Sequence, residues 1–447
     1  MTFSPGEALL IVGIIFLVVL LLGHPLTFTL GGLAVLFAVT MWGNPNAINL
    51  FVRTTTGICT NIVYVAVPLF IFMGCILERS GAAEGLFESM YVIFGRIRGG
   101  IAMTTILMCL LVGSATGIIG ATLTLMTMLA LPSMMKYKYD TSLSTGTIMS
   151  AGCLSTILPP SIIMVIYGAQ AQISIGKLFA GGVGPGLLLA GLYFLYVLIR
   201  VWVDPKSAPA IDPEEAAKYS TKQKIIMVAI NLLPTAFLIL AVLGSIVFGV
   251  ATPTEAAALG CVGAVILAII NRRFSWQIIK ESCYATMRTT AMIMWIILSA
   301  AMFTAVFLGL GGGELLASLV RDLEVSRWLV MAFILFLLLV MGLAIDCYGV
   351  LLIGIPVFTP IVYALGFDPL WFGIMFCVMI QASYLSPPFS YAAIYVKGVA
   401  KSAYGIEMPM AQLFKAAFIF IGLQMIAVIL LCLFPGIITW LPELFFK

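Results

Sequence analysis

The stretch LSTILPPSII, residues 154–163, places two consecutive prolines inside a strongly apolar region. Proline lacks a backbone N–H and its ring clashes with the preceding turn, so the pair predicts a broken helix. A second pair occurs in QASYLSPPFS, residues 381–390. The surroundings of these two breaks decide how the chain folds and what it binds.

The composition predicts a membrane protein. Of its 447 residues, 62% are hydrophobic and only 9% are charged, which is too little polar surface for a soluble domain of this size. Many apolar runs are long enough to cross a hydrocarbon layer of ~30 Å. Among these are residues 8–22, 62–77, 178–201, 225–250, 329–344 and 414–434. The expected fold is an all-α polytopic membrane protein.

The sequence lacks the residues that several classes of function require. The net charge of +4 is small and dispersed, so no nucleic-acid partner is expected. Nine cysteines form no C-x-x-C pair and His24 is the single histidine, which argues against a transition-metal site. The sequence also has no phosphate-binding loop and no nucleophile elbow. Neither an enzyme nor a protein with an organic cofactor is expected.

The chain repeats itself at a spacing of 228 residues. Matched pairs at this spacing are Pro25 and Pro253, Pro132 and Pro360, Asp140 and Asp368, Pro159 and Pro387, Pro160 and Pro388, and Tyr167 and Tyr395. This pattern predicts two related halves, residues 1–203 and 225–447, joined by a polar cytoplasmic linker at 204–224. Each half is expected to contain scaffold helices, an amphipathic arm helix (82–97; 314–328), a re-entrant hairpin (101–135; 329–365) and a broken helix (142–170; 369–396).

The distribution of basic residues predicts the orientation. With both termini outside, the assigned crossings leave Arg53, Lys177, Arg321, Arg327 and Lys447 outside and all other Lys and Arg residues inside. An odd number of crossings in each half inverts the second half relative to the first. The fold is thus expected to be an inverted repeat with two re-entrant hairpins and two broken helices.

Matching breaks in two inverted halves predict a binding site near the middle of the membrane. Backbone groups freed from a helix in lipid are costly unless protein, water or a ligand satisfies them. Carbonyl and hydroxyl oxygens around both proline pairs are the neutral ligands that an alkali cation accepts. The expected hairpin tips, 112–122 and 341–350, face these breaks. The alternative is that glycines such as Gly113, Gly117 and Gly120 only allow close helix packing.

Two acidic residues lie well inside apolar segments. A carboxylate at the membrane centre costs at least ~2.5 kcal/mol, so each needs a partner or a function. Asp346, at the second tip, is interpreted as a ligand for cation or substrate, with a purely structural carboxylate as the alternative. Glu255, which follows Pro253 at the start of an apolar segment, is expected to cap a helix N-terminus.

Several motifs together resemble a known family. GSATG followed by PSMMKYKY, the run AGCLSTILPPSI, the segment GVATPTEAAALG and the late GFDPLWFGI are similar to the large membrane subunit of tripartite ATP-independent periplasmic (TRAP) transporters. The resemblance implies an elevator of the ion-transporter superfamily in the bacterial inner membrane, which takes up an organic acid with sodium ions. It also implies two partners: a periplasmic binding protein and a separate small membrane subunit of about four helices. Ser155, Tyr384, Ser386 and Ser390 depart from the family's usual residues.

Combining the breaks with this resemblance gives hypothetical ligand sets. The first sodium site comprises Ser114, Thr116, Gly152, Ser155, Thr156 and Pro159, and the second comprises Asp346, Gly349, Ser383, Ser386 and Pro387. A carboxylate substrate is expected between the tips, near Ser161, Asp346 and Ser390. Competing interpretations are a stand-alone sodium–carboxylate symporter or ion antiporter of the same superfamily, an intramembrane enzyme and a channel.

Overall fold

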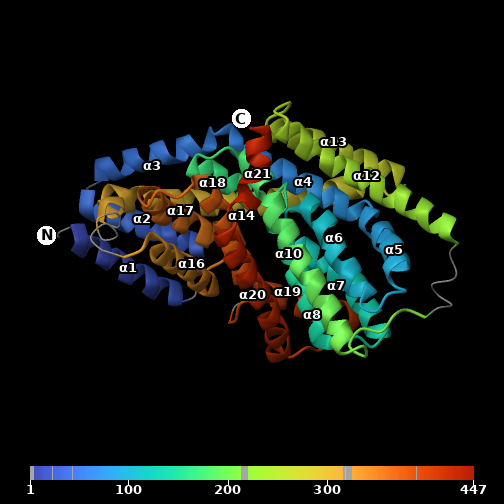
Figure 1. Cartoon of the computed structure of the whole chain (residues 1–447). Helices are drawn as coiled ribbons and strands as arrows, with labels where there is room; N and C mark the ends of the chain where they lie inside the picture. The colour runs from blue at the N-terminus through green and yellow to red at the C-terminus, as the bar shows by residue number, and fades with distance from the viewer. Residues whose placement is uncertain are drawn as a thin grey trace.

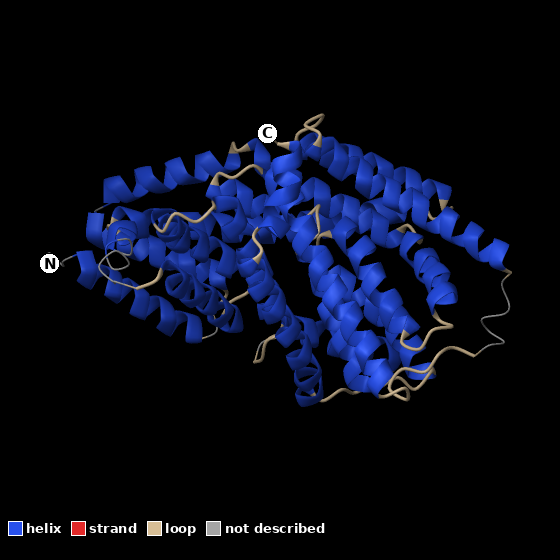
Figure 2. Cartoon of the chain, viewed as in Figure 1, coloured by secondary structure: helices blue, strands red, loops and turns tan. Residues whose placement is uncertain are grey.

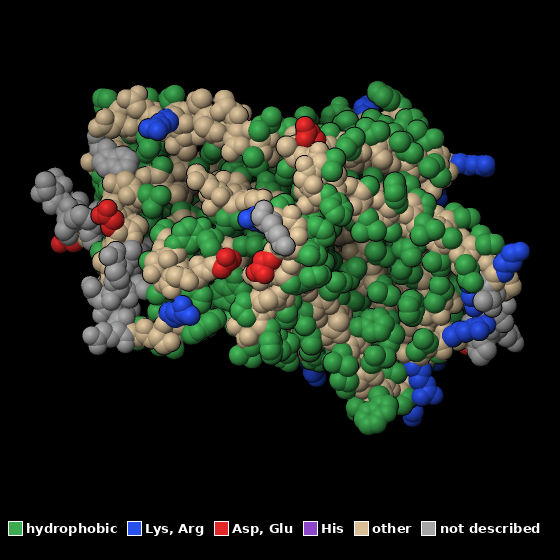
Figure 3. Space-filling view, turned by 45° about the horizontal axis from the view of Figure 1, so that its top comes forward, with side chains coloured by type: hydrophobic (Ala, Val, Ile, Leu, Met, Phe, Trp, Pro, Cys, Tyr) green, Lys and Arg blue, Asp and Glu red, His purple; other side chains and the backbone are tan. Residues whose placement is uncertain are grey.

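The protein is helical throughout the part that is described. A computed structural model describes residues 5–22, 24–42, 44–212, 220–315, 318, 325–388 and 390–446. Within these ranges the regular elements are helices, with no strand (Figure 2). Eight of the described helices are long and apolar enough to cross a membrane. Apolar side chains also dominate the visible surface (Figure 3), which suits contact with lipid. The prediction of an all-α membrane protein is confirmed.

The first half of the chain runs from α1 to α10 (Figure 1). Its elements are α1 Pro5–Leu21, α2 Leu26–Trp42, α3 Asn44–Cys59, η1 Ile62–Val65, α4 Ala66–Arg79, α5 Ala82–Phe94, α6 Gly100–Thr116, α7 Ile119–Lys136, α8 Thr141–Cys153, η2 Leu154–Thr156, α9 Ile162–Ala171 and α10 Ile175–Val203. The segment expected as the first hairpin thus contains α6 and α7, and the helix that begins at Thr141 is interrupted before α9.

The second half runs from α12 to α21. Its elements are α12 Thr221–Val247, α13 Pro253–Ile270, α14 Trp276–Gly309, α16 Arg327–Ala344, α17 Cys347–Ala364, α18 Pro369–Leu385, α19 Tyr391–Tyr404, α20 Met410–Leu433 and α21 Gly436–Phe445. Most of the predicted second arm, 314–328, lies outside the described residues, as do 213–219 of the predicted linker. The segment expected as the second hairpin contains α16 and α17.

Helices that are matched at the 228-residue spacing exchange partners. Helix α2 packs against α14, and its counterpart α13 packs against α4. In the same way α7 packs against α19 and α17 against α9, while α8 packs against α20 and α18 against α10. Helices from both halves therefore enclose a common interior, which explains why the two breaks lie close to elements of the opposite half.

Both interrupted helices begin with the same cap. The Asp140 carboxylate accepts the Leu143 N–H at 2.8 Å, and the Asp368 carboxylate accepts the Trp371 N–H at 2.7 Å. An aspartate at this position satisfies one of the N–H groups that a helix start leaves without a partner. Asp140 and Asp368, which are matched at the 228-residue spacing, thus have the same structural role, the capping of a helix start.

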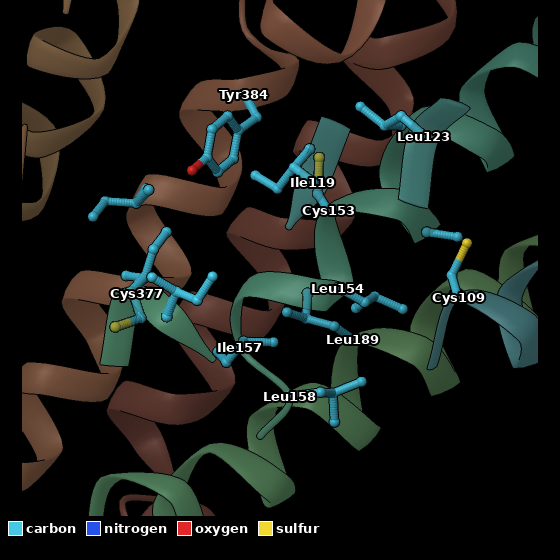
Figure 4. Close-up of a cluster of buried hydrophobic side chains, with 14 of the residues drawn as sticks. Cys109, Ile119, Leu123, Cys153, Leu154, Ile157, Leu158, Leu189, Cys377 and Tyr384 are labelled. Atoms are coloured by element: carbon cyan, nitrogen blue, oxygen red, sulfur yellow. The ribbon is translucent and has the colours of Figure 1, made fainter. Parts of the chain in front are cut away.

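The interior behind the breaks is closely packed and apolar. Figure 4 shows side chains from α7, α8 and α18 in one buried cluster, among them Ile119, Cys153 and Cys377. Both cysteines are fully buried and free. Here they act as small hydrophobic residues, and the cluster anchors the helix ends that carry the candidate site.

Candidate functional site

The first tip lies directly against the first break. Helix α6 ends at Thr116, and the next residue, Gly117, has a φ of +60° and donates its N–H to Gly113 O at 2.9 Å. A Cβ atom at Gly117 would lie 2.9 Å from Pro160 O, and one at Gly113 would lie 3.1 Å from Ser155 Cβ. These glycines therefore allow the tip to approach the break, and the left-handed backbone at Gly117 is the one that glycine adopts without strain.

The predicted hydroxyls at this contact all donate to the backbone. Ser114 Oγ donates to Leu111 O at 2.8 Å, Ser155 Oγ to Gly152 O at 2.9 Å and Thr156 Oγ1 to Cys153 O at 2.8 Å. Thr116 Oγ1 lies 3.2 Å from Gly113 O and 3.0 Å from Thr122 Oγ1. A hydroxyl whose proton is engaged in this way keeps lone pairs available, which is what a cation ligand requires.

The breaks are built alike. The Pro159–Pro160 and Pro387–Pro388 peptide bonds are both cis. In the first break Ser161 Oγ donates to Thr156 O at 2.5 Å and accepts the Met164 N–H at 3.4 Å. One serine thus covers a carbonyl that Pro160 leaves free and also caps α9.

The second break repeats this arrangement. Ser390 Oγ donates to Tyr384 O at 3.1 Å and accepts the Ala393 N–H at 3.3 Å, which caps α19. Ser161 and Ser390 are both fully buried. The proton of each hydroxyl is used within the chain, and neither side chain is accessible to a substrate in this structure. Phe389 lies outside the described residues.

The second tip is more open than the first. Asp346 caps α17 and accepts the Gly349 N–H at 3.3 Å, yet its side chain is exposed. A Cβ atom at Gly342, in α16, would contact the Ser383 side chain, so this hairpin packs onto the second break. Ser383 Oγ donates to Ile380 O at 2.6 Å and Ser386 Oγ to Ala382 O at 2.9 Å. The hydroxyl pattern of the first break therefore recurs.

The two predicted cation sites differ in their access to solvent. All six residues of the first set are buried, whereas in the second set Asp346 is exposed and Pro387 is half-buried. The structure brings the tip and the break of the first set into contact through Ser155 and Gly113, whereas the second hairpin meets Ser383 through Gly342, which is not in the second set. A Cβ atom at Gly152 would contact Leu123 of α7, and one at Gly349 would contact Leu26 of α2. These two glycines therefore also touch apolar helices beside the sites.

The donor set suits a hard monovalent cation. It consists of hydroxyl and carbonyl oxygens with one carboxylate, and no group of three or more His, Cys, Asp or Glu side chains gathers among the described residues. Neutral oxygens are typical ligands for hard cations such as alkali ions. In this set only Asp346 supplies a full negative charge.

Sequence reasoning missed a row of aromatic side chains that begins at the first tip. We define Tyr384, Tyr391 and Tyr395 as the tyrosine row. The Tyr384 and Tyr391 ring centroids are 6.2 Å apart and the Tyr391 and Tyr395 centroids are 4.9 Å apart. A Cβ atom at Gly120, just past the first tip, would lie 2.8 Å from the Tyr395 ring. The row therefore starts at the first tip.

Glu255 has the structural role expected for it. Its carboxylate accepts the Thr252 N–H at 2.8 Å, while Thr252 Oγ1 accepts the Glu255 N–H at 3.3 Å. This reciprocal capping box begins α13. The capping prediction is confirmed.

Comparison with known proteins identifies a transporter family. Residues 13–437 match the family described as "Tripartite ATP-independent periplasmic transporter, DctM component". The C4-dicarboxylate TRAP transporter large permease protein DctM of Pseudomonas aeruginosa is 29% identical over 380 residues, which are 85% of this chain and 86% of that protein. The ectoine TRAP transporter large permease protein TeaC of Halomonas elongata is 28% identical over 96% of this chain and 97% of that protein.

A solved structure shares the fold. The MtrF protein of Neisseria gonorrhoeae, whose structure illuminates a class of antimetabolite efflux pumps, superimposes with a TM-score of 0.63. The match covers 90% of this chain and 85% of that chain at 12% sequence identity. At this identity the likeness concerns the fold alone.

Proposed function

This chain belongs to the DctM component family of tripartite ATP-independent periplasmic transporters. From that premise we propose that it drives uptake of a small organic acid with sodium ions. As a large permease subunit it is a multi-pass membrane protein and not an enzyme. Its family implies a small membrane subunit and a periplasmic binding protein as partners, and the bacterial inner membrane as its location. We place both termini on the periplasmic side, and we take the small subunit to be a separate chain of about four helices.

The main support is the repeated contact between tip and break. In each half, hydroxyls of the tip or break point their protons at the backbone, and a serine caps the second half-helix. One sodium ion would bind among Ser114, Thr116, Gly152, Ser155, Thr156 and Pro159. The other would bind among Asp346, Gly349, Ser383, Ser386 and Pro387. Substrate would lie between the tips near Ser161, Asp346 and Ser390.

The charge balance makes such uptake responsive to voltage. Moving one net positive charge inward gains about 2.3 kcal/mol per 100 mV of membrane potential. Two sodium ions with one monovalent anion carry one net positive charge. The proposed cycle would therefore be driven by both the sodium gradient and the membrane potential.

An elevator motion is the proposed route across the membrane. Helix α5 is flanked by Gly81 and Gly99, whose φ angles are +75° and +76°. Such residues are suited to joints between a fixed scaffold and a moving body. In this proposal α5 and its counterpart, which lies largely outside the described residues, are the arms that carry the hairpins and broken helices.

Reconstitution tests the proposal. The full chain, its small membrane subunit and its binding protein are placed in proteoliposomes, and uptake of the ligand that co-purifies with the binding protein is followed. We expect uptake with an inward sodium gradient, little with potassium, and none for Asp346→Ala. Near-normal, sodium-dependent uptake by Asp346→Ala would refute the second site. Uptake by this chain alone would instead indicate a stand-alone symporter.

A further inference from the structure

A polar pocket opens beside α3. It has a volume of about 420 Å³, within the range of roughly 300–1,000 Å³ that small-molecule sites occupy. None of its lining residues belongs to the two sodium sets or to the substrate set proposed above. We call it the α3 pocket, and the side chains and backbone used below are those of Arg53, Thr54, Gly57, Asn61, Tyr64 and Gln170.

The polar groups of the α3 pocket have protons left to donate. Asn61 Oδ1 accepts the Val63 N–H at 3.0 Å, so the Nδ2 group of Asn61 is left for another acceptor. The Tyr64 hydroxyl accepts a hydrogen bond from Gln170 Nε2 at 3.0 Å, which leaves the phenol proton to be donated. Arg53 is exposed, and among the described residues no ion pair involves it. This set suits a ligand that accepts hydrogen bonds and carries negative charge.

No acidic side chain lines the α3 pocket. The lining residues lie in segments that contain no Asp or Glu, namely 8–77, 141–203 and 282–313. The carbonyls at the two helix ends beside the pocket are occupied: Thr56 O accepts the Thr60 N–H at 2.9 Å, and Gly168 O accepts the Ile173 N–H at 3.0 Å. The Arg53 guanidinium is therefore the only full charge among the lining residues, and it attracts anions.

The α3 pocket lies on the side that the proposed function makes periplasmic. Figure 1 shows α3 along the same edge of the molecule as the C-terminus and the loop between α12 and α13. Helix α9 begins directly after the first break and ends beside the pocket. Its 10 residues span roughly 15 Å. The pocket is thus one short helix away from the first break.

The α3 pocket belongs to one half only. At the spacing of 228 residues, Arg53, Tyr64 and Gln170 correspond to Glu281, Met292 and Gly398. In an inverted repeat, equivalent positions face opposite sides of the membrane. The donors are therefore present on the outer side alone, which suits an anion that arrives from that side.

We propose that the α3 pocket binds the carboxylate of a small organic acid on the periplasmic side, before the acid reaches the tips. The Arg53 guanidinium pairs with the carboxylate, and the Tyr64 hydroxyl and Asn61 Nδ2 donate to its oxygens. This inference rests on the proposed uptake of an organic acid and adds a receiving site to it.

Acids and their neutral amides test the pocket directly. Succinate, pyruvate and gluconate, each beside its neutral amide, are titrated by calorimetry onto the complex of this chain with its small subunit. The buffer contains potassium chloride at fixed ionic strength and no sodium, because the α3 pocket shares no residue with the sodium sets. We expect at least one acid to bind, about tenfold or more tightly than its amide.

Matched variants separate the pocket from general charge. Arg53→Gln should weaken binding of the acid about tenfold, whereas Lys177→Gln, which removes an exposed charge expected on the same side, should not. Gly57→Leu keeps Arg53 but fills the pocket, because an added Cβ at Gly57 has no atom within 4 Å. It should also weaken binding. Its control is Gly191→Leu, at another helical glycine whose added Cβ has no neighbour within 4 Å.

Several results would overturn the inference. They are failure of all three acids to bind, equal binding of the amides, and unchanged binding in both Arg53→Gln and Gly57→Leu. Melting temperatures check that the variants are folded, and a misfolded one is replaced by Arg53→Met or Gly57→Val. Glycerol 3-phosphate, a soluble lipid headgroup, is titrated in the same way. Its binding more tightly than every acid would assign the pocket to lipid instead.

Uptake assays keep the two proposals apart. In the reconstituted complex, Arg53→Gln should raise the concentration of ligand-loaded binding protein that gives half-maximal uptake, and should leave the half-saturating sodium concentration unchanged. If neither concentration changes, the receiving role is wrong and the proposed sodium coupling stands. Uptake by the unaltered complex that does not need sodium would refute the coupling, while binding to the α3 pocket in potassium chloride would stand.

Discussion

Replacing Gly117 with alanine tests whether the approach of the first tip to the first break governs sodium binding. Gly117 has a φ of +60°, and an added Cβ would lie 2.9 Å from Pro160 O. Ordinary contacts begin at 3.4 Å, so the tip must withdraw by about 0.5 Å. A left-handed backbone costs a residue other than glycine roughly 1–2 kcal/mol.

If sodium binding requires the native contact between the first tip and the first break, the free energy needed to restore this contact in Gly117→Ala weakens sodium binding. Overpacking a close contact of this kind costs roughly 1–3 kcal/mol, which corresponds to a rise of about 5- to 150-fold in the half-saturating sodium concentration. The matched control is Gly249→Ala, because Gly249 has a φ of +69° and no atom within 4 Å of its added Cβ. Both variants carry the backbone penalty, but only Gly117→Ala displaces a tip.

The assay is sodium-dependent uptake by the reconstituted complex, with melting temperatures recorded for both variants. The reasoning is refuted if Gly117→Ala and Gly249→Ala show the same half-saturating sodium concentration. A loss of stability in both, with a sodium defect in Gly117→Ala alone, is the expected result.

Two further substitutions separate cation binding from stability. Thr116→Val removes a hydroxyl of the first site that lies 3.0 Å from Thr122 Oγ1, so sodium titration should give a half-saturating concentration about tenfold higher. The control is Thr105→Val on the same helix, which removes a buried hydroxyl that donates to Ile101 O. It should leave the half-saturating sodium concentration unchanged. Equal effects of the two substitutions on this concentration would contradict the first site. Glu255→Ala breaks the capping box at Thr252 and should lower the melting temperature while sodium dependence stays normal, whereas a sodium defect would assign Glu255 a role in transport.

The sequence predicted those parts of the fold that local chemistry controls. Consecutive prolines interrupt a helix wherever they occur, and Asp140 and Asp368 cap helix starts through bonds to residues three positions later. The segment α3 was not predicted, because Asn44–Cys59 is amphipathic and contains no long apolar run. The short α21 was likewise not predicted, because it lies beyond the last predicted apolar run, which ends at residue 434.

The candidate site was less accessible to sequence reasoning. Serine and threonine near a break are recognisable as oxygen ligands, but the direction of each hydroxyl proton depends on the local backbone. The tyrosine row escaped notice because Tyr384 precedes the break and Tyr391 follows it, so only the folded chain brings their rings within 6.2 Å.

The exchange of partners between helices matched at the 228-residue spacing makes each half of the chain depend on the other. Because α7 is covered by α19 and α9 by α17, a single half would leave these surfaces bare. Either half expressed alone is therefore expected to be incomplete, and the two halves should have to be produced together to enclose the interior.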